Sequence, residues 1–349
     1  MSEAEHKVQP LMEAESVDSL PTGADYIYEP KWDGFRCLAS KNGATVSLQS
    51  KAGQPLARYF PEIVAAFKKL PVTELVMDGE LVIPCGDTLC FDHLLLRLHP
   101  AASRVLKLAT ATPAAFVVFD LLSLDGESIQ SRTLLERKKL LSKVFTVHRL
   151  KSPFFLSPMV EDPQQAMKWL GQTGSSLDGI MAKKADAPYC AGSRECMQKL
   201  KLIRSADCVV GGFRYASKGR VVGSLLLGLY DEQGKLHHVG YTSSIKQDEK
   251  AALTVKLDRL EAEPGFTGRA PGGPSRWNSE RSAEWVPLKP ELVVEVAFDH
   301  VTGERFRHGT KLLRWRPDKA PAQCSIDQLQ SAKANFKKLL KLKGSKGKP

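Results

Sequence analysis

The sequence is poor in cysteine, and its seven cysteines include no CxxC pair. An odd number without that spacing argues against a disulfide framework and against a zinc site, and it favours a reducing compartment. The chain also lacks an apolar stretch near its start and any run long enough to cross a bilayer. We therefore expect a cytoplasmic protein that has no membrane partner.

Acidic residues are the scarcer charged class, with 39 Asp and Glu against 50 Lys and Arg and a formal net charge of +11. This excess favours a polyanionic partner such as nucleic acid, although many basic proteins bind none. The last 19 residues hold seven lysines and no acid, so we expect a basic tail there. The length and the 42% hydrophobic content suit two folded domains.

The residue pattern changes near residue 204. Before it, Asn42-Gly43 between alternating apolar residues predicts a hairpin, Pro61 begins a helix, and Thr133 with Glu136 has capping-box spacing. After it, short strands with Gly-rich turns predict a small antiparallel barrel, and the Gly- and Pro-rich stretch 264–274 predicts a mobile loop. The predicted parts are a tail at 1–22, domains at 23–204 and 205–330, and a basic tail at 331–349.

A candidate nucleophile, Lys31, lies at the junction of two predicted strands in Lys31-Trp32-Asp33-Gly34. Lysine attacks only when deprotonated, and cationic neighbours or a metal ion lower its pKa. Gly34 would let the backbone approach a ligand closely. Alone the motif is weak, because about one chain in ten of this length carries it by chance, and a surface turn is the simpler interpretation.

Carboxylates recur in otherwise apolar strands. Asp78 and Glu80 share one face of a predicted strand and suit a ribose hydroxyl or a divalent ion, with a β-bulge and solvated acids as the alternative. Asp178 and Lys183 place an acid and a cation on another predicted strand. Asp178 suits Mg²⁺, and Lys183 suits a phosphate. Phe119 ends another apolar strand and suits stacking on a purine, although Phe there is more often part of a core.

Two further groups are informative only together with the others. Lys199 and Lys201 alternate on one strand, where two cations repel unless an anion lies between them, and a solvated face is the alternative. The second group lies far downstream and consists of Arg316, Asp318 and Lys319. Taken alone, it indicates only a basic surface turn.

In chain order, these stretches resemble the motifs of the nucleotidyltransferase superfamily of ATP-dependent DNA ligases and mRNA-capping enzymes: EPKWDGFR, LQSK, MDGELV, FVVFDLL, LDGIMAKK, MQKLK and LRWRPDK. Within it, the stretches EPKWDGFR, HPAASRV, PSRWN and RWRPDK look most like bacterial ligase C. The resemblance spans about Tyr26 to Cys324. It implies an α+β fold: an adenylation (nucleotidyltransferase) domain of antiparallel sheets and flanking helices, then a β-barrel OB-fold domain.

The resemblance implies an ATP-dependent DNA ligase that seals nicks with 3′-OH and 5′-phosphate ends, through a lysyl-AMP on Lys31 and a DNA-adenylate, in DNA repair. The implied cofactors are ATP and Mg²⁺, with Mn²⁺ as an alternative. The implied partners are nicked double-stranded DNA and repair proteins such as end-binding or gap-filling factors, for a monomer at the nucleoid. Only 30 residues precede Lys31, so we expect no added DNA-encircling domain there and a weak unaided grip on nicks.

The resemblance also assigns roles to matching positions. Glu29 and Arg36 would touch the nucleoside, Glu80 the ribose, and Phe119 the adenine. Asp178, where many relatives carry Glu, would hold the metal together with Glu80. The remaining positions would bind phosphate or help to expel pyrophosphate: Lys51 (a place often held by Arg), Lys183, Arg194, Lys199 and Lys201 for the first role, and Arg316, Asp318 and Lys319 for the second.

Three alternatives remain at this point. An RNA ligase or a GTP-dependent capping guanylyltransferase would share the lysine and the strands, but RWRPDK and the ligase C-like barrel favour DNA. A non-catalytic DNA-binding scaffold of the same fold is the third, and the intact set of Lys31, Glu80, Lys183 and the paired lysines argues against it.

Overall fold

The structure, a computed structural model, describes residues 10–172, 177–272, 284–330 and 339. It divides into two compact units, which we call unit 1 (Met1–Leu202 with Ser331–Pro349) and unit 2 (Ile203–Gln330). Their boundary lies close to the change in residue pattern near position 204. Within the described ranges, no helix has the length and apolar character that a membrane crossing requires.

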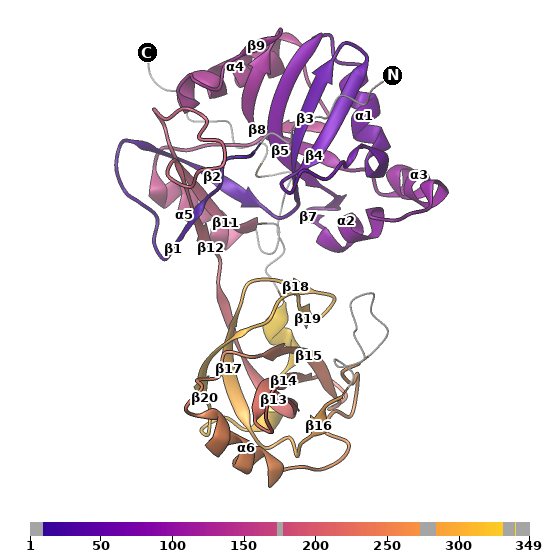
Figure 1. Cartoon of the computed structure of the whole chain (residues 1–349), viewed down its shortest axis with the longest axis vertical. Coiled ribbons are helices and arrows are strands. Elements are labelled where there is room, and N and C mark those ends of the chain that lie inside the picture. The colour runs from indigo at the N-terminus through magenta and orange to yellow at the C-terminus, as the bar shows by residue number, and fades with distance from the viewer. Residues whose placement is uncertain (1–9, 173–176, 273–283, 331–338, 340–349) are drawn as a thin grey trace. The chain divides into compact units, whose positions relative to one another are not determined.

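Unit 1 is built on two sheets (Figure 1). One has the strand order β10-β8-β5-β3-β4, with β9 paired to β8, and the other has the order β1-β12-β11-β2. The strands are β1 (Glu15–Val17), β2 (Tyr26–Trp32), β3 (Phe35–Asn42), β4 (Thr45–Ser50), β5 (Glu74–Val82), β6 (Pro84–Cys85), β7 (Thr88–Leu89), β8 (Ala115–Leu124), β9 (Glu127–Ser128), β10 (Phe154–Leu156), β11 (Leu177–Lys184) and β12 (Met197–Lys201). The helices are α1 (Pro61–Lys68), α2 (Phe91–Arg97), α3 (Ala102–Ala111), α4 (Leu134–Val147) and α5 (Pro163–Gln172).

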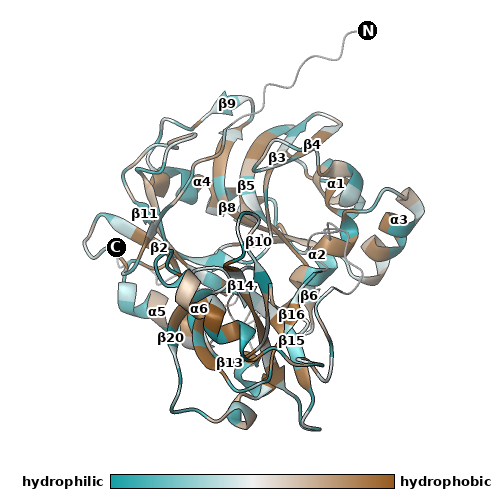
Figure 2. Ribbon diagram, turned by 60° about the horizontal axis from the view of Figure 1, so that its bottom comes forward, coloured by the Kyte–Doolittle hydropathy of each residue, from teal (hydrophilic) through white to brown (hydrophobic). Residues whose placement is uncertain are grey.

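Local signals placed several of these elements correctly. The predicted hairpin forms between β3 and β4, with Gly43 at a φ of +56°. Helix α1 begins at Pro61, and Thr133 caps α4 through the predicted capping box with Glu136. Helix α4 packs against β8, whose buried side chains join the apolar core of unit 1 (Figure 2).

From residue 10 on, the N-terminal segment is not the tail that was predicted for residues 1–22, and residues 1–9 lie outside the described ranges. Leu11 and Met12 are 4% and 3% exposed, and β1 pairs in parallel with β12. This pairing joins residues far apart in the sequence, so no local sequence pattern predicts it. The predicted basic tail at 331–349 lies outside the described residues except for Leu339, which is buried with Trp169 in unit 1.

Unit 2 is an OB-fold barrel. Its sheet has the order β15-β14-β13-β17-β20, and a parallel bridge between Thr242 and Thr310 joins the two edges. Phe266 is 4% exposed in the barrel core, so this part of the predicted mobile loop is packed. The elements are β13 (Arg204–Tyr215), β14 (Val222–Tyr230), β15 (Leu236–Thr242), α6 (Lys250–Asp258), β16 (Val286–Pro287), β17 (Val293–Phe298), β18 (Val301–Thr302), β19 (Arg305–Phe306) and β20 (Lys311–Trp315).

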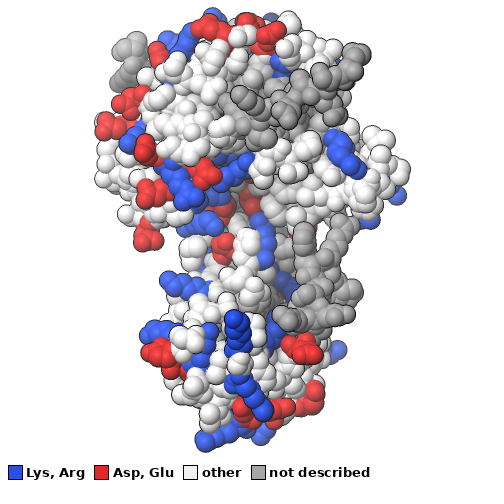
Figure 3. Space-filling view, in the orientation of Figure 1, with Lys and Arg blue, Asp and Glu red and all other residues white. Residues whose placement is uncertain are grey.

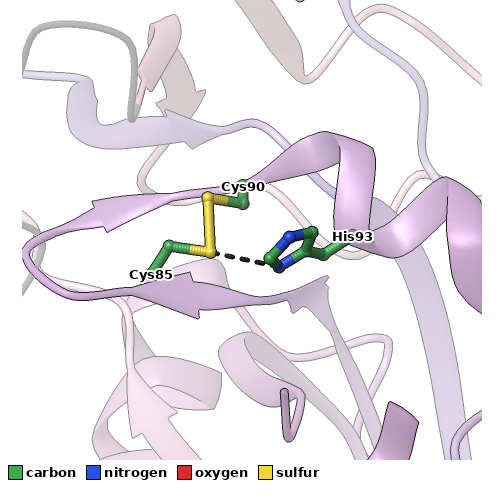
Figure 4. Close-up of side chains that lie close together, drawn as sticks. All are labelled: Cys85, Cys90 and His93. Atoms are coloured by element: carbon green, nitrogen blue, oxygen red, sulfur yellow. Dashed lines mark hydrogen bonds between the residues drawn. A yellow bond between two sulfur atoms is a disulfide. The ribbon is translucent and has the colours of Figure 1, made fainter. Parts of the chain in front are cut away.

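Four cysteines form disulfides, against the expectation from their number and spacing. Cys85 pairs with Cys90 across the β6–β7 hairpin, and Cys190 pairs with Cys196. Turns bring the Cα atoms of these pairs to 5.9 and 6.3 Å, within disulfide reach without a CxxC spacing. His93 Nδ1 lies 3.3 Å from Cys85 Sγ (Figure 4). Metal ligation by this group would need free thiolates, so the disulfide and a metal site exclude each other.

Candidate active site

A pocket of about 220 Å³ in unit 1 is lined by residues from both sheets. Ligand pockets are usually about 300–1,000 Å³, so a nucleotide would need some of the lining side chains to move. The predicted site residues that line it are Glu29, Lys31, Arg36, Lys51, Glu80, Phe119, Lys183 and Lys199.

Lys31 is paired with an acid that a strand irregularity presents. On β2 it lies opposite Gly179 of β11, and the register shifts between Leu177 and Gly179. The shift takes Asp178 out of regular pairing, and its carboxylate forms an ion pair with the Lys31 ammonium. Gly179 has a φ of +142°, and a Cβ there would collide with the carbonyl of Leu200, so the irregularity requires glycine.

Glu29 anchors a buried group of charges behind the pocket. It is 1% exposed, and its Oε1 is 3.3 Å from Lys183 Nζ. The same oxygen pairs with Lys138 of α4, which the sequence analysis did not identify. Lys183 Nζ also lies 4.5 Å from the centre of the Phe119 ring. Phe119 therefore faces the pocket and its cations.

The two acids of β5 have different environments. Asp78 is fully buried and accepts hydrogen bonds from Arg36 Nε at 3.1 Å, Arg36 Nη2 at 2.7 Å and the Tyr189 hydroxyl at 2.7 Å. Asp78 therefore fixes Arg36, whose Cζ lies 5.7 Å from the centre of the Phe119 ring. Glu80, two residues on, lines the pocket itself.

Glu80 is held close to the turn that follows Lys31. A Cβ on Gly34 would collide with the Leu81 carbonyl and with Glu80 Cγ, so glycine at this position allows the close approach of β5. Burial raises the pKa of Glu80 to about 8, although Lys31 and Arg36 oppose the rise. Near neutral pH its carboxyl is mostly protonated, so it can both donate to and accept from a hydroxyl group.

This pKa predicts a change in the pH dependence of stability. Between the ordinary value of 4.5 and about 8, the folded chain keeps a proton on Glu80 that the unfolded chain releases. The free energy of unfolding therefore falls as pH rises through this window, by at most about 1.4 kcal/mol per pH unit. Glu80→Gln should remove this loss, so its stability relative to wild type should increase from about pH 5 to about pH 8. Urea unfolding of Glu80→Gln and wild type at pH 5 and pH 8 measures this change in relative stability. Glu74→Gln, on the same strand, is the control. An equal difference in the free energy of unfolding between Glu80→Gln and wild type at the two pH values would refute the prediction.

The N-terminal segment holds cations at one side of the pocket. Glu13 pairs with Lys51 at 3.2 Å and with Arg194 at 3.0 Å. Lys199 donates to the Ala14 carbonyl at 3.2 Å, and its pKa is lowered by burial and then by Lys31. Five cations and three acids line the pocket, which suits a polyphosphate. Figure 3 shows Lys and Arg gathered beside acids on one face of this unit.

Two predicted phosphate ligands lie outside the pocket lining. Arg194 is held by Glu13, and Lys201 lies opposite Gly179 in the β11–β12 pairing. In unit 2, the three predicted residues form one cluster around Asp207, which was not predicted. Arg316 pairs with Asp207 and Asp318, both at 2.8 Å, and Lys319 pairs with Asp207 at 3.3 Å.

Comparison with known proteins gives consistent matches along the chain. Residues 11–201 match the ATP dependent DNA ligase domain, and residues 218–319 match the ATP dependent DNA ligase C terminal region. The chain is 42% identical to DNA ligase C2 of Mycolicibacterium smegmatis over 342 residues and 39% identical to DNA ligase C of Mycobacterium tuberculosis over 339 residues. Each alignment covers 93% of this chain and 94% of the relative.

A solved structure supports the fold assignment independently. It comes from a structure–function study of DNA binding by Lig E DNA ligases, and it matches with a TM-score of 0.54 at 18% sequence identity. The match covers 88% of this chain and 100% of that chain.

Proposed function

Because this chain belongs to the ATP-dependent DNA ligases, we propose that it seals nicks with 3′-OH and 5′-phosphate ends through an AMP carried on Lys31. The observation that carries this proposal is that Lys31 lines a pocket with four further cations and forms an ion pair with Asp178, which lies outside the pocket lining. It combines an amine, an acid able to take its proton, and positive charge for a triphosphate. The match of residues 218–319 to a DNA ligase region disfavours the RNA-capping alternative.

Sealing then consists of three phosphoryl transfers. Lys31 Nζ loses a proton toward Asp178 and bonds to the α-phosphorus of ATP, while the bond to pyrophosphate breaks. A 5′-phosphate oxygen at the nick next attacks the AMP phosphorus and releases Lys31. Finally, the 3′-hydroxyl attacks the 5′-phosphorus and AMP leaves.

The other pocket residues bind and orient the nucleotide in this proposal. Phe119 stacks on the base, Glu29 faces its edge, and the protonated Glu80 exchanges hydrogen bonds with a ribose hydroxyl. Arg36, which Asp78 fixes near Phe119, contacts the nucleoside. The phosphates are contacted by the remaining predicted cations: Lys51, Lys183, Arg194, Lys199 and Lys201.

Carboxylates at the pocket also fit a divalent ion. Mg²⁺ is usually bound by one or two carboxylates together with substrate phosphates. Asp178, which pairs with Lys31, is the better ligand, because Glu80 is mostly neutral near pH 7. Bound Mg²⁺, or Mn²⁺ in its place, would neutralise charge on the phosphates.

We assign unit 1 to adenylation and the Asp207 cluster of unit 2 to pyrophosphate release. Arg316, Asp318 and Lys319 would act on the nucleotide only in the first transfer. Lys319→Ala should therefore slow Lys31 adenylation by about 100-fold, since it removes one cation from a developing charge. Sealing of a nick that already carries AMP should stay within about twofold of wild type, because that step needs no pyrophosphate release. Equal adenylation rates in the variant and wild type would contradict the assignment.

A second hollow suits the nicked double-stranded DNA. A groove of about 750 Å³ shares Arg36, Lys51 and Glu80 with the pocket and adds Arg58. Such a groove beside Lys31 suits strand phosphates, and affinity should then fall with rising salt. A salt-independent affinity for nicks would contradict the groove assignment.

We infer a monomer that works at the nucleoid in DNA repair, with proteins such as end-binding or gap-filling factors.

The proposed function is tested in two stages. Mass spectrometry after incubation with ATP and Mg²⁺ should find one added AMP on Lys31, and labelled GTP should give little adduct. A nick-sealing assay then should convert a nicked duplex into a continuous strand. Stable labelling by GTP alone would favour a capping enzyme, and no adduct on Lys31 would favour a non-catalytic scaffold.

A further inference from the structure

A lysine outside the pocket lining holds the carboxylate that faces the pocket. Lys138 on α4 is 4% exposed, and its ammonium pairs with Oε1 of Glu29. Lys183 approaches the same oxygen from β11 at 3.3 Å. One buried carboxylate oxygen is therefore shared by two buried ammonium groups, only one of which lines the pocket.

Lys138 is fixed in place by its neighbour on the helix. Arg137 is fully buried and donates from Nε and Nη2 to Asp120 of β8, each at 2.9 Å. This two-point contact sets the position of the α4 turn that carries both residues. Burial lowers the pKa of Lys138, and the nearby Glu29 carboxylate opposes that shift. A buried ammonium of this kind is maintained only beside a partner of opposite charge.

Nucleotide binding would change this balance. In the proposed function, Lys183 contacts a phosphate of ATP, so it would leave Glu29 when the nucleotide enters. The Glu29 carboxylate, which is 1% exposed, would then keep only one of its two cations. Lys138, which does not face the phosphates, is the cation that would remain.

The protonation state of Glu29 matters for base recognition. An ionised carboxylate only accepts hydrogen bonds, whereas a protonated one also donates. The edge of adenine presents an amino group, which donates, and guanine presents a carbonyl oxygen at the corresponding position, which accepts. An ionised Glu29 therefore favours adenine and repels guanine, and a protonated Glu29 loses this selectivity.

We propose that Lys138 is a positioning residue that holds the Glu29 carboxylate in place as a hydrogen-bond acceptor, and thereby sets the preference of this ligase for ATP over GTP. The inference rests on the proposed function only in assigning the base to the side of the pocket formed by Glu29 and Phe119. Lys138 touches neither the nucleotide nor the DNA in this proposal.

The test compares Lys138→Met with Lys138→Arg and with Lys139→Met, an exposed neighbour on α4 that serves as the matched control. Lys138→Met keeps the length of the side chain without its charge. Equilibrium binding of ATP and of GTP is measured first, so that the result does not depend on lysine adenylation. We expect Lys138→Met to weaken ATP binding by about 10- to 100-fold and to lower the ATP-to-GTP preference by a similar factor. Lys138→Arg should restore most of the ATP affinity and most of the ATP-to-GTP preference. Lys139→Met should equal wild type in both.

A purely structural role would give a different pattern. It would lower the thermal unfolding temperature while leaving the ATP-to-GTP ratio at the wild-type value, and that result would overturn the proposal. A double-mutant cycle tests the proposal if Lys138→Met folds poorly. In a Glu29→Gln background, Lys138→Arg and Lys138→Gln should have equal ATP-to-GTP preference, because the carboxylate that Lys138 positions is absent. An unequal preference in that background would also count against it. Absence of a Lys31 adduct in wild type would refute the proposed function, and the binding ratios would still decide the role of Lys138.

Discussion

Lys31→Ala should form no AMP adduct and should seal nicks at least about 10⁴-fold more slowly than wild type with ATP. The variant lacks the only atom that the proposed mechanism joins to the α-phosphorus, and a neighbouring lysine cannot reach the same position on β2. Rapid-quench measurement of adenylation, followed by nick sealing, gives both rates. Lys184→Ala, an exposed lysine on β11, is the matched control and should behave as wild type.

The same variant separates loss of chemistry from loss of folding. A nick prepared with AMP already on its 5′-phosphate needs no lysine nucleophile, so Lys31→Ala should still seal it. Undiminished strand joining from ATP in Lys31→Ala would remove the basis of the proposed mechanism. Failure on the pre-adenylated nick as well would point to a folding or DNA-binding defect.

Asp178→Asn should be the second most damaging change, slowing Lys31 adenylation by about 10²- to 10⁴-fold. Asparagine keeps the size of the side chain but cannot take a proton, and it is a poor ligand for Mg²⁺. The ion pair between Asp178 and the reacting amine of Lys31 would be lost. Single-turnover adenylation at saturating ATP and Mg²⁺ measures the effect.

Asp178→Glu is the control for this prediction. It returns the charge with one added methylene, so adenylation should stay within about tenfold of wild type. Thermal unfolding of both variants excludes a general loss of structure. If Asp178→Asn adenylated Lys31 at the wild-type rate, Asp178 would have neither the proton nor the metal role.

Local signals in the sequence located most of the elements that carry the site. The Asn42-Gly43 turn, the helix start at Pro61 and the capping box of α4 each depend on residues within a few positions, and all three formed as predicted. Strand alternation and the ligase motifs also placed Lys31, Lys183 and Lys199 on strands, and these lysines lie on β2, β11 and β12 and line the pocket.

Features that depend on distant contacts were not predicted. The pairing of β1 with β12 has no signature in the first 22 residues, so Glu13 was missed as a partner of Lys51 and Arg194. Lys138 lies on α4, and only the packing of this helix brings it to Glu29. The disulfides escaped notice because turns, rather than sequence spacing, bring the cysteines together.

The sharing of the Glu29 carboxylate has a consequence for inhibitors. The pocket measures about 220 Å³, and Lys183, which lines it, pairs with Glu29 at 3.3 Å. A competitive compound that offers Lys183 an anionic group in place of Glu29 should therefore bind more tightly than an uncharged adenine mimic. Compound screening is better carried out on the lysyl-AMP form or beside a phosphate-bearing fragment than on the empty protein.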